Sequence, residues 1–143
     1  SKDVGTSNSL VKNMINGSVP GTPKIHIGIV DVRDVASAHI LAMESSSANG
    51  ERIIVSEKEL WVHEVAAILR DAGFNKTPKI VFPEWLMKIV ALFRKDLALM
   101  IPMIGKRRDV SSAKARELLG WRPMKAELSI IDTAQQLKDF DLL

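Results

Sequence analysis

The sequence predicts a mixed α/β fold that is rich in helices, with short strands and about five or six helices. Three observations lead to this prediction. Residues 25–43 have the pattern of a strand that runs directly into a helix, and residues 52–55 form a β-branched run typical of a buried strand. Apolar residues recur at helical spacing over most of the remaining chain. We expect residues 1–143 to form a single domain.

The first helix is predicted around Leu10, Val11, Met14 and Ile15, with Ser7 or Asn8 as its cap and Gly17 as its end. Residues 18–24 contain two prolines and a glycine, which indicates a loop.

In residues 25–43, alternating apolar residues from Ile27 to Val32 indicate a strand, and Asp34 is expected to cap the helix that follows. The strand expected at 52–55 would pair in parallel with it if both strands shared a sheet, but the two strands could also belong to different sheets.

An amphipathic helix is predicted at residues 59–72 and ends before Gly73. A short strand at 79–82 precedes a helix that Pro83 opens. An apolar segment at 97–104 is interrupted by Pro102, and residues 107–110 are a candidate strand. The last two helices are expected at 113–119, ending at Gly120, and at about 127–138.

Composition narrows the classes of function. The chain is 46% hydrophobic and 26% charged, as in ordinary globular proteins, and it has no cysteine to form a disulfide or a thiolate site. No signal-peptide pattern is visible at the start, so we expect a cytoplasmic location.

Neither nucleic acid nor a membrane is an expected partner. The net charge is only +3, and the single basic run, residues 106–108, lacks interleaved aromatic residues. A basic surface module at this run is therefore the weakest hypothesis for function. The apolar region 82–104 contains five charged residues, which excludes a membrane-spanning helix. Association with a membrane surface is the less favoured alternative there.

Several short motifs resemble the second half of extended short-chain dehydrogenase/reductases. They are VDVRDVA at 30–36, Ala38-His39, and GERII at 50–54, with Ser9-Leu10 before them and LGWRP at 119–123 after them. The group with the most similar motifs is the dihydroflavonol reductase-like, NADP-dependent one. The resemblance implies an incomplete Rossmann-type protein, in which residues 1–143 are the smaller, carboxy-terminal substrate-binding lobe without the amino-terminal dinucleotide-binding half.

The resemblance also implies that this chain carries no catalytic residue. Members of the family use a Tyr-x-x-x-Lys pair, and the chain contains no tyrosine. It also has no glycine-rich loop to hold a pyrophosphate. We therefore expect NADP or NAD, and a small carbonyl or alcohol substrate, only in a full-length protein that includes the missing Rossmann half.

Five residues are candidates for binding sites in that full-length protein. In the family a serine at the position of Ser9 approaches the cofactor phosphates, whereas its alternative role is a helix cap. The substrate-pocket candidates are Gly28, Trp85, Met87 and Met100. The last three lie in the region that covers substrate in the family, and packing in the core is their alternative role. Gly28 stands where flavonoid reductases tend to carry a polar side chain that points at the substrate, which argues against a flavonoid substrate.

Other polar residues are interpreted as structural. The three histidines, His26, His39 and His63, lack the spacing of a metal site, so no metal is expected. Asp34 is interpreted as a cap and Arg33 as a brace between the strand and a nearby carboxylate.

The alternative function is a stand-alone interaction module without enzymatic activity. A stand-alone module explains poorly why the strand expected at 52–55 has few local partners, because a bare strand edge recruits another chain. We therefore expect the isolated chain to self-associate or to swap an element.

Overall fold

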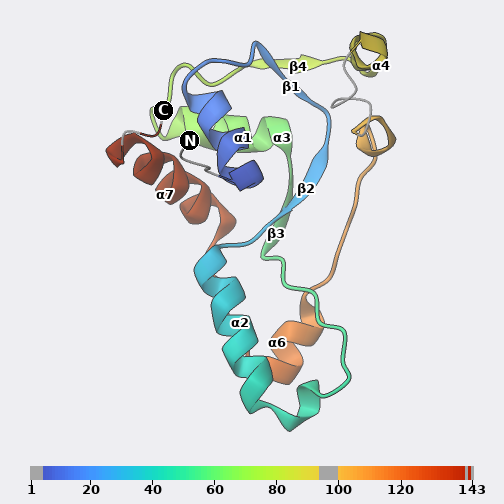
Figure 1. Ribbon diagram of the computed structural model, residues 1–143, viewed down its shortest axis with the longest axis vertical. Coiled ribbons are helices and arrows are strands. Elements are labelled where there is room, and N and C mark those ends of the chain that lie inside the picture. The colour runs from blue at the N-terminus through green and yellow to red at the C-terminus, as the bar shows by residue number, and fades with distance from the viewer. Residues whose placement is uncertain (1–4, 94–99, 141, 143) are drawn as a thin grey trace.

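The computed structural model describes residues 5–93, 100–140 and 142 (Figure 1). Across these residues the molecule is an elongated α/β structure with six α-helices, four short strands and two 3-10 helices. This confirms the predicted mixed, helix-rich fold. No helix in the described part of the chain is long and apolar enough to cross a membrane.

The elements follow in chain order. The α-helices are α1 (Gly5–Ile15), α2 (Val32–Glu44), α3 (Val62–Asp71), α4 (Glu84–Phe93), α6 (Ala113–Leu119) and α7 (Ala126–Asp139). The strands are β1 (Gly21–Pro23), β2 (His26–Ile29), β3 (Lys58–Trp61) and β4 (Ile80–Phe82). The 3-10 helices are η1 (Ser46–Ala48) and η2 (Ile101–Met103). The helices predicted at 113–119 and about 127–138 and the strand predicted at 79–82 agree with α6, α7 and β4 to within about a residue at each end.

The strands form two separate two-stranded sheets. β2 and β3 pair antiparallel, with His26 opposite Trp61, whereas β1 and β4 pair in parallel, with Gly21 opposite Ile80. The expected loop at 18–24 therefore contains a strand, β1. Glycine is needed at position 21, because a Cβ there would lie 2.7 Å from the Phe82 ring of β4.

Two predicted strands are absent. Residues 52–55 are not a strand, and their backbone groups bond to no described residue, although Ile53 and Val55 pack on apolar neighbours. Residues 107–110 are irregular as well, with Arg108 held by the His26 ring. The strand that pairs with β2 is β3, and the helix predicted from residue 59 begins at Val62 for that reason. In the segment 97–104, residues 97–99 lie outside the described part, and η2 follows them.

The main core lies between α1, α3 and α7. Ala66, Leu69 and Ala134 have no exposed surface, and Met14 of α1 is 1% exposed. Helical spacing on α3 places Val62, Val65, Ala66 and Leu69 on the side that faces this core. Burial of these side chains is the principal favourable contribution to folding in this lobe.

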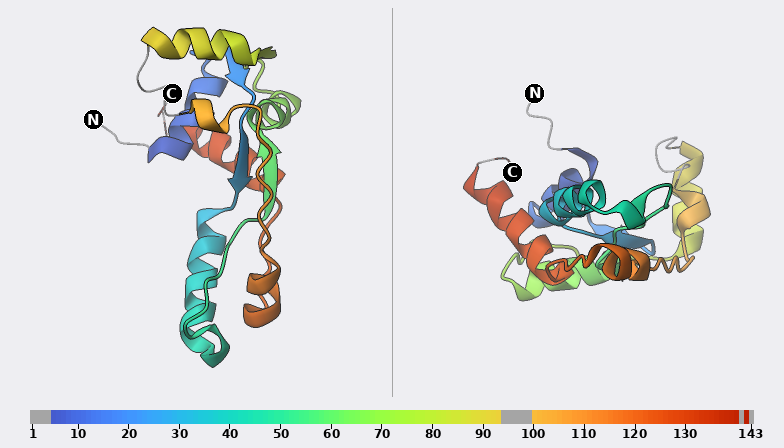
Figure 2. Two further views of the ribbon diagram at one scale, coloured as in Figure 1. Left: turned by 90° about the vertical axis from the view of Figure 1, so that its right-hand side faces the viewer. Right: turned by 90° about the horizontal axis from the view of Figure 1, so that it is seen from below.

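A second, smaller core joins α2 to α6 at the far end of the molecule (Figures 1 and 2). It is built around Trp121, which is 1% exposed and packs with Ala38, Ala115 and Leu119. The Trp121 Nε1–H donates to the Asp34 carbonyl oxygen at 2.9 Å. Gly120, with φ of +62°, lets the chain leave α6 and return to this core.

The main core makes a prediction about stability. Leu69→Ala removes a side chain with no exposed surface, so we expect it to lower the free energy of unfolding by about 2 to 5 kcal/mol. Leu128→Ala is the matched control, because Leu128 of α7 is 55% exposed and its truncation should cost about 0.5 kcal/mol or less. Urea unfolding followed by circular dichroism measures both changes. Equal losses in the two variants would contradict this location of the core.

Candidate functional site

A groove of about 370 Å³ lies where the first turn of α2 meets α1 and α7. Apolar side chains and polar groups both contribute to its walls. The lining residues are Asn8, Asp31, Val32, Arg33, Asp132, Thr133, Gln136, Leu137, Phe140 and Leu142.

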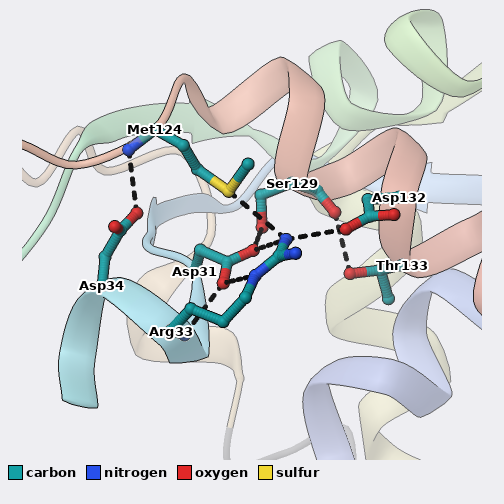
Figure 3. Close-up of polar contacts among 7 residues, drawn as sticks. All are labelled: Asp31, Arg33, Asp34, Met124, Ser129, Asp132 and Thr133. Carbon is teal, nitrogen blue, oxygen red and sulfur yellow. Dashed lines mark hydrogen bonds and ion pairs between the residues drawn. The ribbon is translucent and has the colours of Figure 1, made fainter. Parts of the chain in front are cut away.

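Asp31, and not Asp34, caps α2. The helix begins at Val32, and Asp31 Oδ1 accepts a hydrogen bond from the Arg33 backbone N–H at 2.9 Å. The predicted cap, Asp34, lies inside the first turn of α2, and its Oδ2 accepts from the Met124 N–H at 2.9 Å (Figure 3). Asp34 therefore ties α2 to the segment that leads into α7.

The Arg33 guanidinium forms a paired contact with Asp31. Nε donates to Oδ1 at 2.8 Å and Nη2 donates to Oδ2 at 2.9 Å. Nη2 also reaches Asp132 Oδ2 of α7 at 2.7 Å (Figure 3). On the other side, the Ser129 hydroxyl of α7 donates to Asp31 Oδ2 at 2.8 Å. These contacts confirm that Arg33 is a brace between the start of α2 and a nearby carboxylate.

The same contacts fix the charges of the cluster. Hydrogen bonds from the Arg33 side chain lower the pKa of Asp31 far below its usual range, against the opposing effect of burial. Hydrogen bonds to Asp31 and Asp132 raise the pKa of Arg33. A carboxylate held ionised in this way cannot exchange protons near neutral pH, and an arginine between two carboxylates does not attract an anion. The contacts of the cluster therefore join the start of α2 to α7.

Ser9 lies one turn inside α1, next to the groove residue Asn8. Its hydroxyl donates to the Gly5 carbonyl oxygen at 2.7 Å, so Ser9 is not the helix cap. Arg33 is paired with two carboxylates, whereas Lys12, three residues after Ser9 on α1, has no ion pair among the described residues. The cofactor role of Ser9 stays a prediction.

The four substrate-pocket candidates do not line the groove. Met87 is 6% exposed and belongs to the main core. Packing in the core was the alternative role predicted for it. Trp85 and Met100 are 63% and 42% exposed. Gly28 is exposed in β2 opposite Glu59, and a Cβ there would lie 3.0 Å from the Ser56 hydroxyl oxygen.

Two of the histidines lie against the same ring: the Trp61 centroid is 4.8 Å from that of His26 and 6.2 Å from that of His63, whereas His39 is exposed on α2. His26 is buried, and its Nδ1 lies 2.9 Å from the Arg108 carbonyl oxygen. His39 Nδ1 lies 2.7 Å from the Val35 carbonyl oxygen. His63 Nδ1 is buried without a hydrogen-bond partner among the described residues. In that part of the chain no group of three or more His, Cys, Asp or Glu could hold a metal ion.

Sequence reasoning missed Ser129 and Asp132, which contact the Asp31–Arg33 pair from α7. The two residues are three positions apart on a helix and so share one face. That spacing could have indicated a polar contact surface on α7. It could not have identified the partner, which lies nearly one hundred residues earlier in the chain.

Comparison with known proteins gives a consistent set of relatives, although no protein-family model matches the chain. A cinnamoyl-CoA reductase of Medicago truncatula is 34% identical over 137 residues, which cover 95% of this chain and 36% of the relative. An NADPH-dependent methylglyoxal reductase of Saccharomyces cerevisiae is 28% identical, over 98% of this chain and 38% of the relative.

Solved structures show the same relationship. The crystal structure of yeast methylglyoxal/isovaleraldehyde reductase complexed with NADPH is matched with a TM-score of 0.67 and 25% identity, over 98% of this chain and 39% of that one. The crystal structure of gox2253 has the same fold over 97% of this chain and 46% of its own, with a TM-score of 0.79 and 22% identity. The chain thus spans well under half the length of the proteins it matches, and it corresponds to their carboxy-terminal part.

The Asp31 cluster makes a prediction about acid stability. Because the pKa of Asp31 is lowered in the folded state, its contribution to stability is present above the unfolded pKa of about 3.9 and is lost as pH falls below it. Asp31→Asn should therefore lower the free energy of unfolding at neutral pH by about 1 to 3 kcal/mol and flatten its decline in acid. Urea unfolding at a series of pH values measures both effects.

Asp132→Asn is the matched control for Asp31→Asn. Asp132 contacts the same Arg33 guanidinium, but its side chain is 40% exposed, so its loss should cost about 1 kcal/mol or less. An equal cost for both variants, or an unchanged acid profile in Asp31→Asn, would show that Asp31 does not have the structural role described.

Proposed function

Because this chain is homologous to the carboxy-terminal part of extended short-chain dehydrogenase/reductases, we propose that it forms the substrate-binding part of an NAD(P)-dependent oxidoreductase. The proposed reaction is hydride transfer between NADP or NAD and a small carbonyl or alcohol, of the ketone/aldehyde reductase or alcohol dehydrogenase type. The observation that carries the proposal is the alignment of 95% of this chain with 36% of a cinnamoyl-CoA reductase.

We further propose that this domain acts with an amino-terminal dinucleotide-binding half and does not catalyse the reaction alone. The chain has no tyrosine and no glycine-rich loop, which supports a division of labour between two parts. The cofactor is proposed to bind the longer protein, with Ser9 near its phosphates, and not this chain by itself. The yeast methylglyoxal reductase relative is NADPH-dependent, and the similar yeast structure was solved with NADPH, which favours NADP over NAD.

The exposed apolar face of α2 is the surface proposed to meet that half. Val32, Ile40 and Met43 are 78%, 57% and 87% exposed, and they lie on one side of the helix. Such side chains in a row on a helix are typical of a face that packs against another element. The neighbouring segment 52–55, with its unbonded backbone, lies alongside the same small core and supports this placement.

Absence of activity in the isolated chain is the first prediction from this proposal. The purified 143 residues should not oxidise NADPH in the presence of aliphatic or aromatic aldehydes and ketones, because the sequence contains no tyrosine. Fusion after the amino-terminal half of the Medicago cinnamoyl-CoA reductase should restore turnover, measured by NADPH absorbance. The matched control is the same fusion with the tyrosine of that half's Tyr-x-x-x-Lys pair replaced by phenylalanine. Turnover by the 143 residues alone would refute the proposal.

Self-association is a second prediction. Without a covering domain, the α2 face and the unbonded segment 52–55 should lead the isolated chain to form dimers or larger species. Light scattering across a concentration series measures the mass. Met43→Ser should shift the equilibrium toward monomer, whereas Leu128→Ser, at another exposed apolar position on α7, should not. A clean monomer at high concentration would contradict this prediction and favour the stand-alone interaction module.

A further inference from the structure

The helix α4 is almost entirely apolar, yet it is poorly covered. In its sequence, EWLMKIVALF, only Glu84 and Lys88 are polar. Met87 faces the main core, whereas Trp85, Ile89 and Leu92 are 63%, 48% and 81% exposed. The spacing of these three residues places them on one side of the helix, opposite Met87. We call this side, formed by Trp85, Ile89 and Leu92, the α4 face. Three apolar residues outside the helix are also exposed: Ile80 and Val81 of β4, and Met100 before η2.

Basic residues outnumber acidic ones in the described residues around α4. Residues 79–93 and 100–109 contain five lysines and arginines but two acidic residues, and Arg107 is paired with one of these, Asp109. Lys88 lies beside Leu92 on the helix surface, and Lys79 and residues 106–108 are exposed. Glu84 turns its carboxylate against Gly105, where a Cβ would collide with it, so the basic run begins next to the start of α4.

We propose that the α4 face binds the surface of an anionic lipid bilayer. A short helix with tryptophan and aliphatic residues on one side and a lysine beside them, Lys88, is suited to lie in the plane of the headgroups. The aliphatic side chains enter the acyl boundary, and the basic residues meet the negative surface potential. The inference gives Trp85 and Met100 a role other than contact with substrate, and it does not depend on the reductase function.

Charge and position distinguish lipid from other occupants. Pairing of two copies through this face would bring two surfaces of net positive charge together, which is unfavourable. Nucleic acid would pair with the lysines but would leave Ile89 and Leu92 without apolar partners. The other exposed apolar helix, α2, lies at the opposite end of the molecule (Figure 2) and has no comparable basic surroundings. The two apolar faces therefore suit different partners.

Vesicle sedimentation tests the proposal. The 143-residue chain should sediment with vesicles of phosphatidylcholine and phosphatidylserine but weakly with phosphatidylcholine alone, and added salt should reduce binding. Trp85 fluorescence should shift to the blue on binding. Trp121 is 1% exposed and should not contribute a shift. Trp85→Phe should keep most of the sedimentation and lose most of the shift.

Substitutions at exposed positions separate the apolar and charged contributions. Ile89→Ser with Leu92→Ser should abolish sedimentation, and Lys88→Glu should weaken it at least roughly fivefold. The matched controls are Leu128→Ser for exposed apolar surface and Lys138→Glu for exposed positive charge. Both controls should bind as the parent chain does, with circular dichroism confirming that every variant is folded.

Four results would overturn the proposal. The first is equal binding, or none, to the two vesicle types, and the second is unchanged binding of the Ile89→Ser, Leu92→Ser variant. The third is self-association that this same variant abolishes, which would make the α4 face a contact between copies. The fourth is loss of vesicle binding when the chain is fused to an amino-terminal dinucleotide-binding half, which would make it a contact between domains.

Discussion

The Asp31 carboxylate is the interaction on which the arrangement of this molecule depends. It is an ionised group with 7% of its surface exposed, and such a group is stable only when other polar groups satisfy it. The Arg33 backbone and side chain come from α2, and the Ser129 hydroxyl comes from α7. One carboxylate thereby fixes the start of α2 against the last helix. Since α2 carries the second core, the position of the whole α2–α6 end follows from this contact.

Sequence patterns predicted the elements that are determined by local chemistry. The helices α6 and α7 have clear apolar spacing, and Gly120 ends the first of them in a left-handed conformation. Short strands were harder to predict, because whether a segment becomes a strand depends on the partner it pairs with more than on its own residue types. Residues 52–55 are β-branched but find no partner, whereas Lys58–Trp61 resembles a helix start but pairs with β2. At the site, Asp31 and Asp34 are both suitable caps, and only the observed start of α2 distinguishes them.

The residues that identify the family here are structural ones. Asp31, Arg33 and Asp34 belong to the VDVRDVA motif, and all three join α2 to the segment around α7. Trp121 of the LGWRP motif holds α6 to α2 in the same way. A scaffold can therefore reveal kinship without carrying chemistry, because packing constraints leave as clear a pattern in sequence as catalysis does. Substrate-pocket candidates chosen by motif position alone, such as Met87, can belong to the core instead.

The parallel pairing of β1 with β4 has a consequence for how the chain folds. Gly21 lies opposite Ile80, so this pair closes a loop that contains α2, β3 and α3. Closing so long a loop costs chain entropy before any contact compensates for it. The antiparallel strands β2 and β3 are also separated by α2 in the sequence. Helices, whose hydrogen bonds are local, are therefore expected to form before either pair of strands. The helices α3 and α7 are separated by a loop of similar length, from Asp71 to Ala126, so the main core and the β1–β4 pair carry the same entropic cost of closure.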